Sequence, residues 1–116
     1  MQKLKYKIQI EHELYRKGWE LIELGSGNEW WDDEHWKIQH KHYPGIFVYV
    51  CFIVDALNEP NSKAGKIIGE VQATTEFPAT WNDDSTKITS ICMRKEHFGA
   101  KLTKFIQELD AYLAKI

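Results

Sequence analysis

Cysteines, prolines and long hydrophobic runs are scarce in this chain of 116 residues. It has two cysteines, Cys51 and Cys92, and three prolines. A disulfide framework needs more cysteines, and the paired spacing of a zinc site is missing, so we expect two buried free thiols within apolar stretches. The apolar run over 46–54 is much shorter than the ~20 residues of a transmembrane helix, which predicts that no segment spans a membrane.

A secretory leader is not evident either. Residues 1–17 carry charges throughout and have no continuous apolar stretch, so a cytoplasmic location is the expectation. Hydrophobic residues make up 43% of the chain and charged residues 28%, which is typical of a globular protein. At this length we predict a single domain over 1–116. The chain has the general look of a small bacterial protein, and its residues point to no named family.

Charge is distributed unevenly around a net value of −2. Residues 1–18 hold five basic and two acidic groups, whereas residues 20–34 hold six acidic groups and neither lysine nor arginine. Nucleic-acid binding needs a basic excess over a whole face, so this layout argues against it. An acidic tract is instead suited to attracting a basic partner.

Hydrophobic periodicity predicts a helix at each end of the chain. Near the C-terminus, apolar residues recur at spacings of three and four from Phe98 to Ile116. Near the N-terminus we expect a helix over about 3–17, ended by Gly18 in a left-handed conformation, although residues 3–10 also alternate like a strand. The expected inner face of this helix consists of Leu4, Ile8, Ile10, Leu14 and Tyr15.

Five strands are predicted between these helices, over 19–24, 36–42, 46–54, 67–77 and 87–93. The turn residues Tyr43, Pro44 and Gly45 predict a hairpin, and 55–66 is predicted to be a polar connection. Gly69 is expected to form a bulge or a bend in its strand. Short connections without strand–helix–strand alternation indicate an α+β fold: a five-stranded antiparallel sheet with both terminal helices packed on one face, a two-layer sandwich.

The segment 28–36 is the compositional outlier, with three tryptophans and four carboxylates in nine residues. In one interpretation the acids form a turn and the indoles cover the sheet edge, because tryptophan usually packs. In the other, aromatic anchors ringed by charge form a recognition surface. The residues of this candidate binding surface are Trp30, Trp31, Asp32, Asp33, Glu34 and Trp36.

A metal site is the alternative use of the same region. His40 and His42 share one face of a strand about 6.6 Å apart, and Asp33 is the candidate third ligand. Two histidines near a turn are more often a solvated strand end, and no established metal or catalytic motif is present. Cys51 is a poor nucleophile, because an apolar strand raises the pKa of a thiol.

We therefore expect a non-catalytic binding protein without a cofactor, such as an inhibitor or an immunity-like partner protein, whose unidentified protein partner is basic. The alternative is a metal-dependent hydrolase or small-molecule enzyme that uses residues 32–42. A homodimer through a sheet edge or the final helix is compatible with either. The binding hypothesis depends on Trp30 and Trp31 being exposed to solvent.

Overall fold

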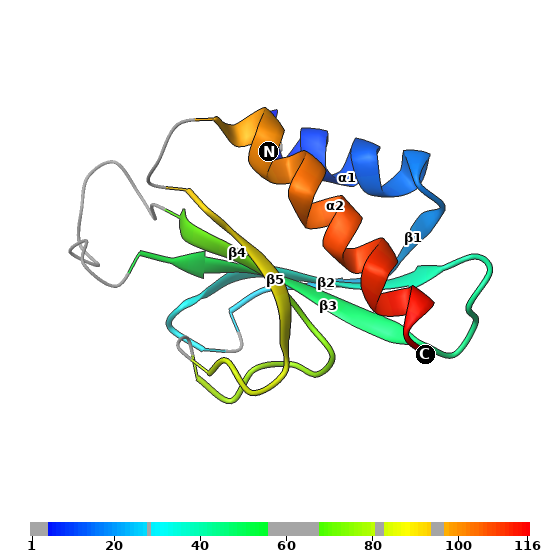
Figure 1. Cartoon of the computed structure of the whole chain (residues 1–116). Helices are drawn as coiled ribbons and strands as arrows, with labels where there is room; N and C mark the ends of the chain where they lie inside the picture. Colours follow the sequence, from blue (N-terminus) through cyan, green and yellow to red (C-terminus); the bar gives the residue numbers. More distant parts are fainter. Residues whose placement is uncertain (1–4, 28, 56–67, 81–82, 94–96) are drawn as a thin grey trace.

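Two helices lie on one face of a five-stranded antiparallel sheet, as Figure 1 shows. The computed structural model describes residues 5–27, 29–55, 68–80, 83–93 and 97–116. Its elements are α1 (Lys5–Arg16), β1 (Trp19–Gly25), β2 (Asp32–His40), β3 (Phe47–Val54), β4 (Ile68–Thr74), β5 (Lys87–Cys92) and α2 (Phe98–Ala114). The strands lie side by side in chain order, so the predicted α+β architecture is confirmed. Neither of these helices is long and apolar enough to cross a membrane.

The main core lies between the sheet and the helices. Alternate residues of β3 face the helices, among them the fully buried Val50 and Phe52. The ring of Trp36 on β2 meets Phe52 edge to face, with ring centroids 4.7 Å apart. α2 contributes Phe105 and Leu109 to the same cluster. The periodic stripe predicted for the last helix is therefore its buried face.

A smaller apolar cluster covers part of the opposite face of the sheet. Cys51 and Ile53 of β3 pack there with Trp31, and Tyr49 and Phe77 contact the cluster. The connections that follow β1 and β4 lie on this side, below the sheet in Figure 1. β3 is thus buried on both faces, which explains why its sequence is a continuous run of apolar residues.

α1 is a helix, so the strand alternative for this segment is wrong. Ile10 and Leu14 are buried as predicted, whereas Ile8 and Tyr15 are exposed and Lys7 is buried in their place. Leu4 lies outside the described residues. Positions 7, 10 and 14 form one stripe of the helix and positions 8 and 15 another, and only the first stripe faces the sheet.

Gly18 ends α1 as predicted, with a φ of +95°. Its amide donates a hydrogen bond to the Tyr15 carbonyl at 3.1 Å, which satisfies one of the last helical acceptors. A Cβ atom at this position would lie 2.8 Å from Nε2 of His40. Both the backbone conformation and the space therefore require glycine here.

β2 begins at Asp32 and ends at His40, whereas residues 36–42 were expected. Asp32 pairs with Ile53 and Glu34 with Phe52 in the β2–β3 ladder, across a register shift. Acidic residues have a low strand propensity, and here tertiary pairing outweighs it. The predicted bulge at Gly69 is confirmed, because Ile68 pairs with Val54 but Glu70 pairs with Ile53. Residues 56–67 of the predicted polar connection lie outside the described residues.

The prediction of two buried thiols is half correct. Cys51 is buried, but Cys92 is exposed. Cys92 stands on an edge strand, and its neighbour Ile91 takes the side that faces the main core. The Cys92 side chain therefore points to the opposite, open face.

Candidate functional site

The tryptophans of the predicted binding surface lie in different environments. Trp30 is 57% exposed, whereas Trp31 is 2% exposed and Trp36 is completely buried. The ring of Trp31 stacks on Phe77 with centroids 5.6 Å apart and planes tilted by 24°. The binding hypothesis required both Trp30 and Trp31 to be exposed, and only Trp30 meets this condition, because Trp31 faces the sheet and completes the smaller apolar cluster.

Asp33 and Glu34 form ion pairs with a buried lysine on α1. Lys7 Nζ donates hydrogen bonds to Oδ2 of Asp33 and Oε1 of Glu34, each at 2.7 Å. Oε2 of Glu34 also accepts a hydrogen bond from the Trp36 indole nitrogen at 2.7 Å. Burial by itself lowers the pKa of Lys7, but hydrogen bonds and charges from the two carboxylates outweigh it, so the pKa lies above its ordinary value. These acids join α1 to β2 and are not presented to a partner.

Asp32 is also engaged inside the protein. It is completely buried, and its Oδ2 accepts a hydrogen bond from Nδ1 of His35 at 2.8 Å. His35 pairs with Cys51 in the β2–β3 ladder, so acid, imidazole and thiol lie on neighbouring positions. Burial, and then the charge of Asp32, raises the pKa of Cys51 to about 12. The thiol is therefore kept protonated, as the sequence predicted, and cannot act as a thiolate nucleophile near neutral pH.

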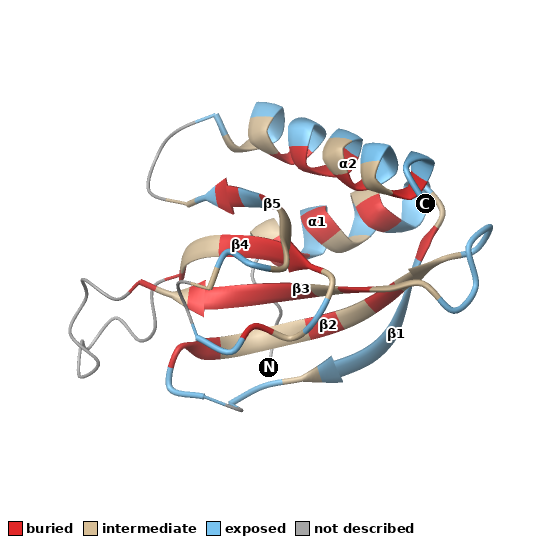
Figure 2. Ribbon diagram, turned by 60° about the horizontal axis from the view of Figure 1, so that its bottom comes forward, coloured by how far each residue is buried: buried red, intermediate tan, exposed pale blue. Residues whose placement is uncertain are grey.

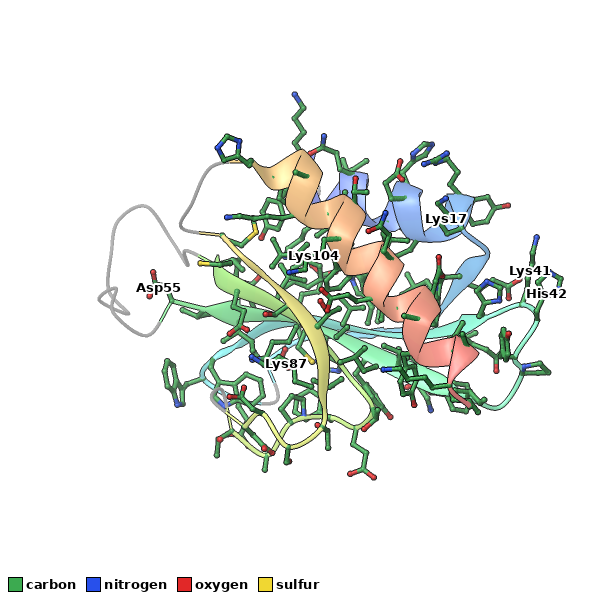
Figure 3. The ribbon with its side chains drawn as sticks, in the orientation of Figure 1. Lys17, Lys41, His42, Asp55, Lys87 and Lys104 are labelled. Atoms are coloured by element: carbon green, nitrogen blue, oxygen red, sulfur yellow. The ribbon has the colours of Figure 1, made fainter. Side chains whose placement is uncertain are left out.

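The residues of the alternative metal site do not converge. The rings of His40 and His42 are 5.5 Å apart, but both nitrogens of His40 are in use: Nε2 donates to the Lys17 carbonyl and Nδ1 accepts from the His42 amide. Asp33 lies seven positions away along β2, roughly 20 Å for an extended chain. Within the described residues no group of three or more His, Cys, Asp or Glu side chains is placed to hold a metal ion. Lys17, Lys41 and His42 instead form a basic end of the molecule, shown in Figure 3.

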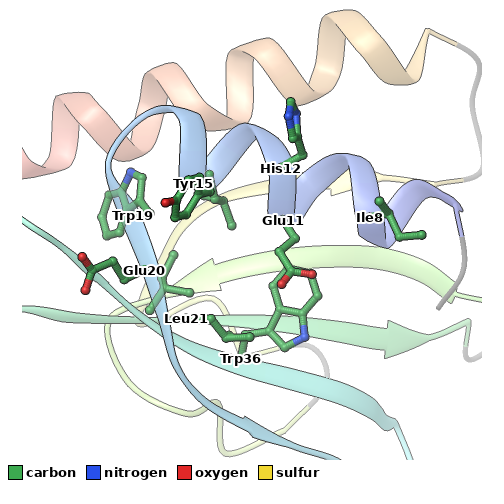
Figure 4. Close-up of a pocket in the computed structure, with 10 residues that line it drawn as sticks. Ile8, Glu11, His12, Tyr15, Trp19, Glu20, Leu21 and Trp36 are labelled. Carbon is green, nitrogen blue, oxygen red and sulfur yellow. The ribbon is translucent and has the colours of Figure 1, made fainter. Parts of the chain in front are cut away.

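An apolar groove that was not predicted from the sequence lies between α1 and β1. It has a volume of about 300 Å³. Its walls include Ile8, Glu11 and Tyr15 from α1 and Leu21 from β1, and Trp36 of β2 lies across from α1 in Figure 4. We call this feature the α1–β1 groove.

The groove exists because α1 diverges from the edge strand. Near its N-terminus α1 lies over β3, where the rings of Tyr6 and Phe52 are 6.1 Å apart, and its C-terminal end leads through Gly18 into Trp19 at the start of β1. Trp19 is 1% exposed, but farther along β1 Leu21 and Leu24 are 39% and 60% exposed. Figure 2 shows β1 as an exposed strand at the open edge of the sheet.

Most of the exposed large apolar side chains belong to the two elements that form this groove or to the connection that follows β1. Eight large hydrophobic residues are exposed in the described part of the chain, and six of them belong to α1, β1 or the β1–β2 connection. We call these six the β1 surface: Ile8, Tyr15, Leu21, Ile22, Leu24 and Trp30. The signal for it was present in the spacing of Ile8 and Tyr15, seven residues apart on one helical stripe, and in the broken alternation of β1.

The charge on β1 is entirely acidic. Glu20 and Glu23 are exposed, and residues 20–34 contain neither lysine nor arginine. Lys37 stands opposite Glu23 in the ladder, but its Nζ lies over the ring of Phe47 on β3, 4.3 Å from the centroid. Among the described residues, Glu20 and Glu23 take part in no ion pair. The β1 surface is thus apolar with carboxylates beside it.

No protein-family model, curated protein or solved structure matches this chain, so geometry and chemistry alone indicate what the site can do.

Proposed function

We propose that this protein is a non-catalytic binding protein that recognises a basic protein partner through the β1 surface; an inhibitor or an immunity-like protein would act in this way. The observation that carries the proposal is the clustering of six of the eight exposed large hydrophobic residues on adjoining elements. Exposed apolar patches of this kind, bordered by polar groups, mark interaction sites. Glu20 and Glu23 would set the charge of the partner.

The contact surface differs from the one expected from the sequence. Trp30 is retained, since its indole is exposed in the β1–β2 connection. The other five residues of the predicted surface support the fold through the contacts described above: Trp31, Asp32, Asp33, Glu34 and Trp36. Their carboxylates are committed to Lys7 and His35, which disfavours acid–base chemistry at this segment.

The test is affinity capture with the purified native chain and two matched double variants. Leu21→Lys with Leu24→Lys places two charges on the exposed edge strand β1, and Ser90→Lys with Cys92→Lys does the same on the opposite edge strand β5. We expect a basic protein from the source cells to be retained by the native chain and the β5 variant but lost from the β1 variant. Circular dichroism and the Tm establish that both variants are folded.

Direct titration of the captured protein completes the test. Its affinity should fall as ionic strength rises, because exposed charges are screened over about 10 Å at 0.1 M salt. Equal retention by the native chain and the β1 variant, or a partner without basic surface, would contradict the proposal.

A further inference from the structure

We propose that the partner adds an extended segment to β1 as a sixth, antiparallel strand, with apolar and basic side chains in alternation. This inference rests on the proposed function and states how the same surface is used. Strand addition to an open sheet edge gains affinity from main-chain hydrogen bonds and specificity from alternate side chains.

The main chain of β1 is oriented for such pairing. The Lys41 amide donates to the Gly18 carbonyl at 3.0 Å, so this carbonyl points toward β2. The direction of the main-chain groups alternates from residue to residue along an antiparallel strand, which directs the N–H and C=O of Leu21 toward the open edge. β1 has β2 on its other side, so a new strand would meet unpaired donors and acceptors.

The side of β1 that faces the helix layer selects apolar residues. Leu21 pairs with Ile38 and Leu24 with Trp36, and both partners belong to the main core. The register shift between Leu21 and Glu23 keeps the two leucines on one face although they are three residues apart. Apolar side chains of an added strand would lie beside these leucines and enter the α1–β1 groove.

The opposite side of β1 selects basic residues. Glu20 pairs with Gln39 and Glu23 with Lys37, so both carboxylates stand on the face turned away from the helices. The alternate side chains of an added strand would lie next to these two charges. Lysine or arginine at those positions would form cross-strand pairs of opposite sign.

The same carboxylates disfavour a second copy of this chain as the added strand. Symmetric antiparallel pairing of two β1 strands keeps the helix layers on one side, so Glu20 and Glu23 of both copies would meet on the other. β1 carries no lysine or arginine to compensate them. Like charges on neighbouring strands are destabilising, so this edge discriminates against self-pairing.

The other edge of the sheet lacks these features. On β5 the side chains that face the helix layer, Thr89 and Ile91, are buried, and Ser90 and Cys92 are the exposed ones. α2 packs against β5, whereas α1 leaves Leu21 and Leu24 uncovered. The contrast identifies β1 as the edge that is open to a partner strand.

The test uses seven-residue peptides that alternate lysine and valine, titrated into the isotopically labelled full chain. A residue placed opposite Leu21 shares its face and turns its own N–H toward β1, so the valines would supply the pairing amides. Methylation of the valine amides should weaken binding by at least about tenfold, while methylation of the lysine amides should leave it unchanged. A peptide alternating glutamate and valine should not bind.

The residues whose NMR amide resonances shift on peptide binding show where the peptide binds. We expect amide resonances of Leu21 and Leu24 to shift saturably, Leu24→Lys to weaken binding, and Ser90→Lys on β5 to leave it unaltered. Strand addition is overturned if no peptide shifts the amide resonances of β1, or if the two methylated peptides bind equally or in reversed order. It is also overturned if sedimentation shows that the chain is a dimer and the amides of β1 are protected in that dimer. Should the basic partner of the capture experiment still depend on β1 in those cases, the proposed function stands and only this mode of binding fails.

Discussion

Lys7 Nζ on α1 and Oε1 of Glu34 on β2 lie 2.7 Å apart, although the residues are 27 positions apart in the sequence. Their side chains are 7% and 17% exposed, so the pair is largely removed from water. This contact, together with the one to Asp33, joins the first helix to the sheet and directs the acidic segment inward.

Lys7→Met should destabilise the protein by about 2–4 kcal/mol, because it leaves two partly buried carboxylates without their cation. Lys104→Met is the control, since Lys104 is 77% exposed and lies 3.7 Å from Glu108. The control should change the free energy of unfolding by no more than about 0.5 kcal/mol. Urea denaturation measures both, and equal effects of the two substitutions would contradict a structural role for Lys7.

Trp31→Ala should cost about 3–5 kcal/mol, because it removes a buried ring that stacks on Phe77. Trp30→Ala should change stability by about 0.5 kcal/mol or less, as expected for an exposed side chain away from the core. Thermal unfolding of the two variants distinguishes the roles of these neighbours. Similar losses for both would mean that Trp30 is also part of the architecture.

Gly18→Ala should destabilise the protein by about 1–3 kcal/mol, since alanine is strained at a φ of +95° and its Cβ would displace His40. Gly99→Ala is matched to it, because nothing lies within 4 Å of a Cβ at that helical position. There we expect a gain of about 0.5 kcal/mol from the higher helix propensity of alanine. Changes of the same sign in denaturation experiments would refute this account of the α1–β1 turn.

The two thiols should differ in their reactivity toward alkylating reagents. Iodoacetamide at pH 8 should modify Cys92, which is exposed, and leave Cys51 unmodified in the native protein. Burial and a pKa raised to about 12 both protect the Cys51 thiol. Peptide mapping by mass spectrometry before and after denaturation gives the result, and labelling of native Cys51 would show that this part of the sheet opens.

Cys51 should also make stability decrease in alkaline solution. The folded thiol has its pKa raised from 9.0 to about 12, so above pH 9 the unfolded chain loses this proton first. The stabilising contribution is complete below pH 9 and is lost as the pH rises toward 12. By pH 10 the loss of unfolding free energy should be about 1 kcal/mol. Unfolding free energies at pH 8 and pH 10 should therefore differ more for the native chain than for Cys51→Ala, and identical differences would contradict the prediction.

The general architecture was predictable because it depends on local periodicity. The stripe of α2 and the apolar run of β3 each specify an element and the faces it buries. Gly18 likewise predicted the end of α1 from its own backbone freedom. Such features need no knowledge of which other segment packs against them.

The roles of the aromatic and acidic residues were decided only by the tertiary structure. Trp30 and Trp31 are identical and adjacent, yet one faces solvent and the other Phe77, because burial depends on which face a distant element covers. Ile8 and Tyr15 look like core residues in the sequence, but α1 turns a different stripe toward the sheet, where the charged Lys7 finds two carboxylates. Periodicity identifies an apolar stripe, whereas the path of a helix across its sheet determines whether that stripe is buried or left at an open edge.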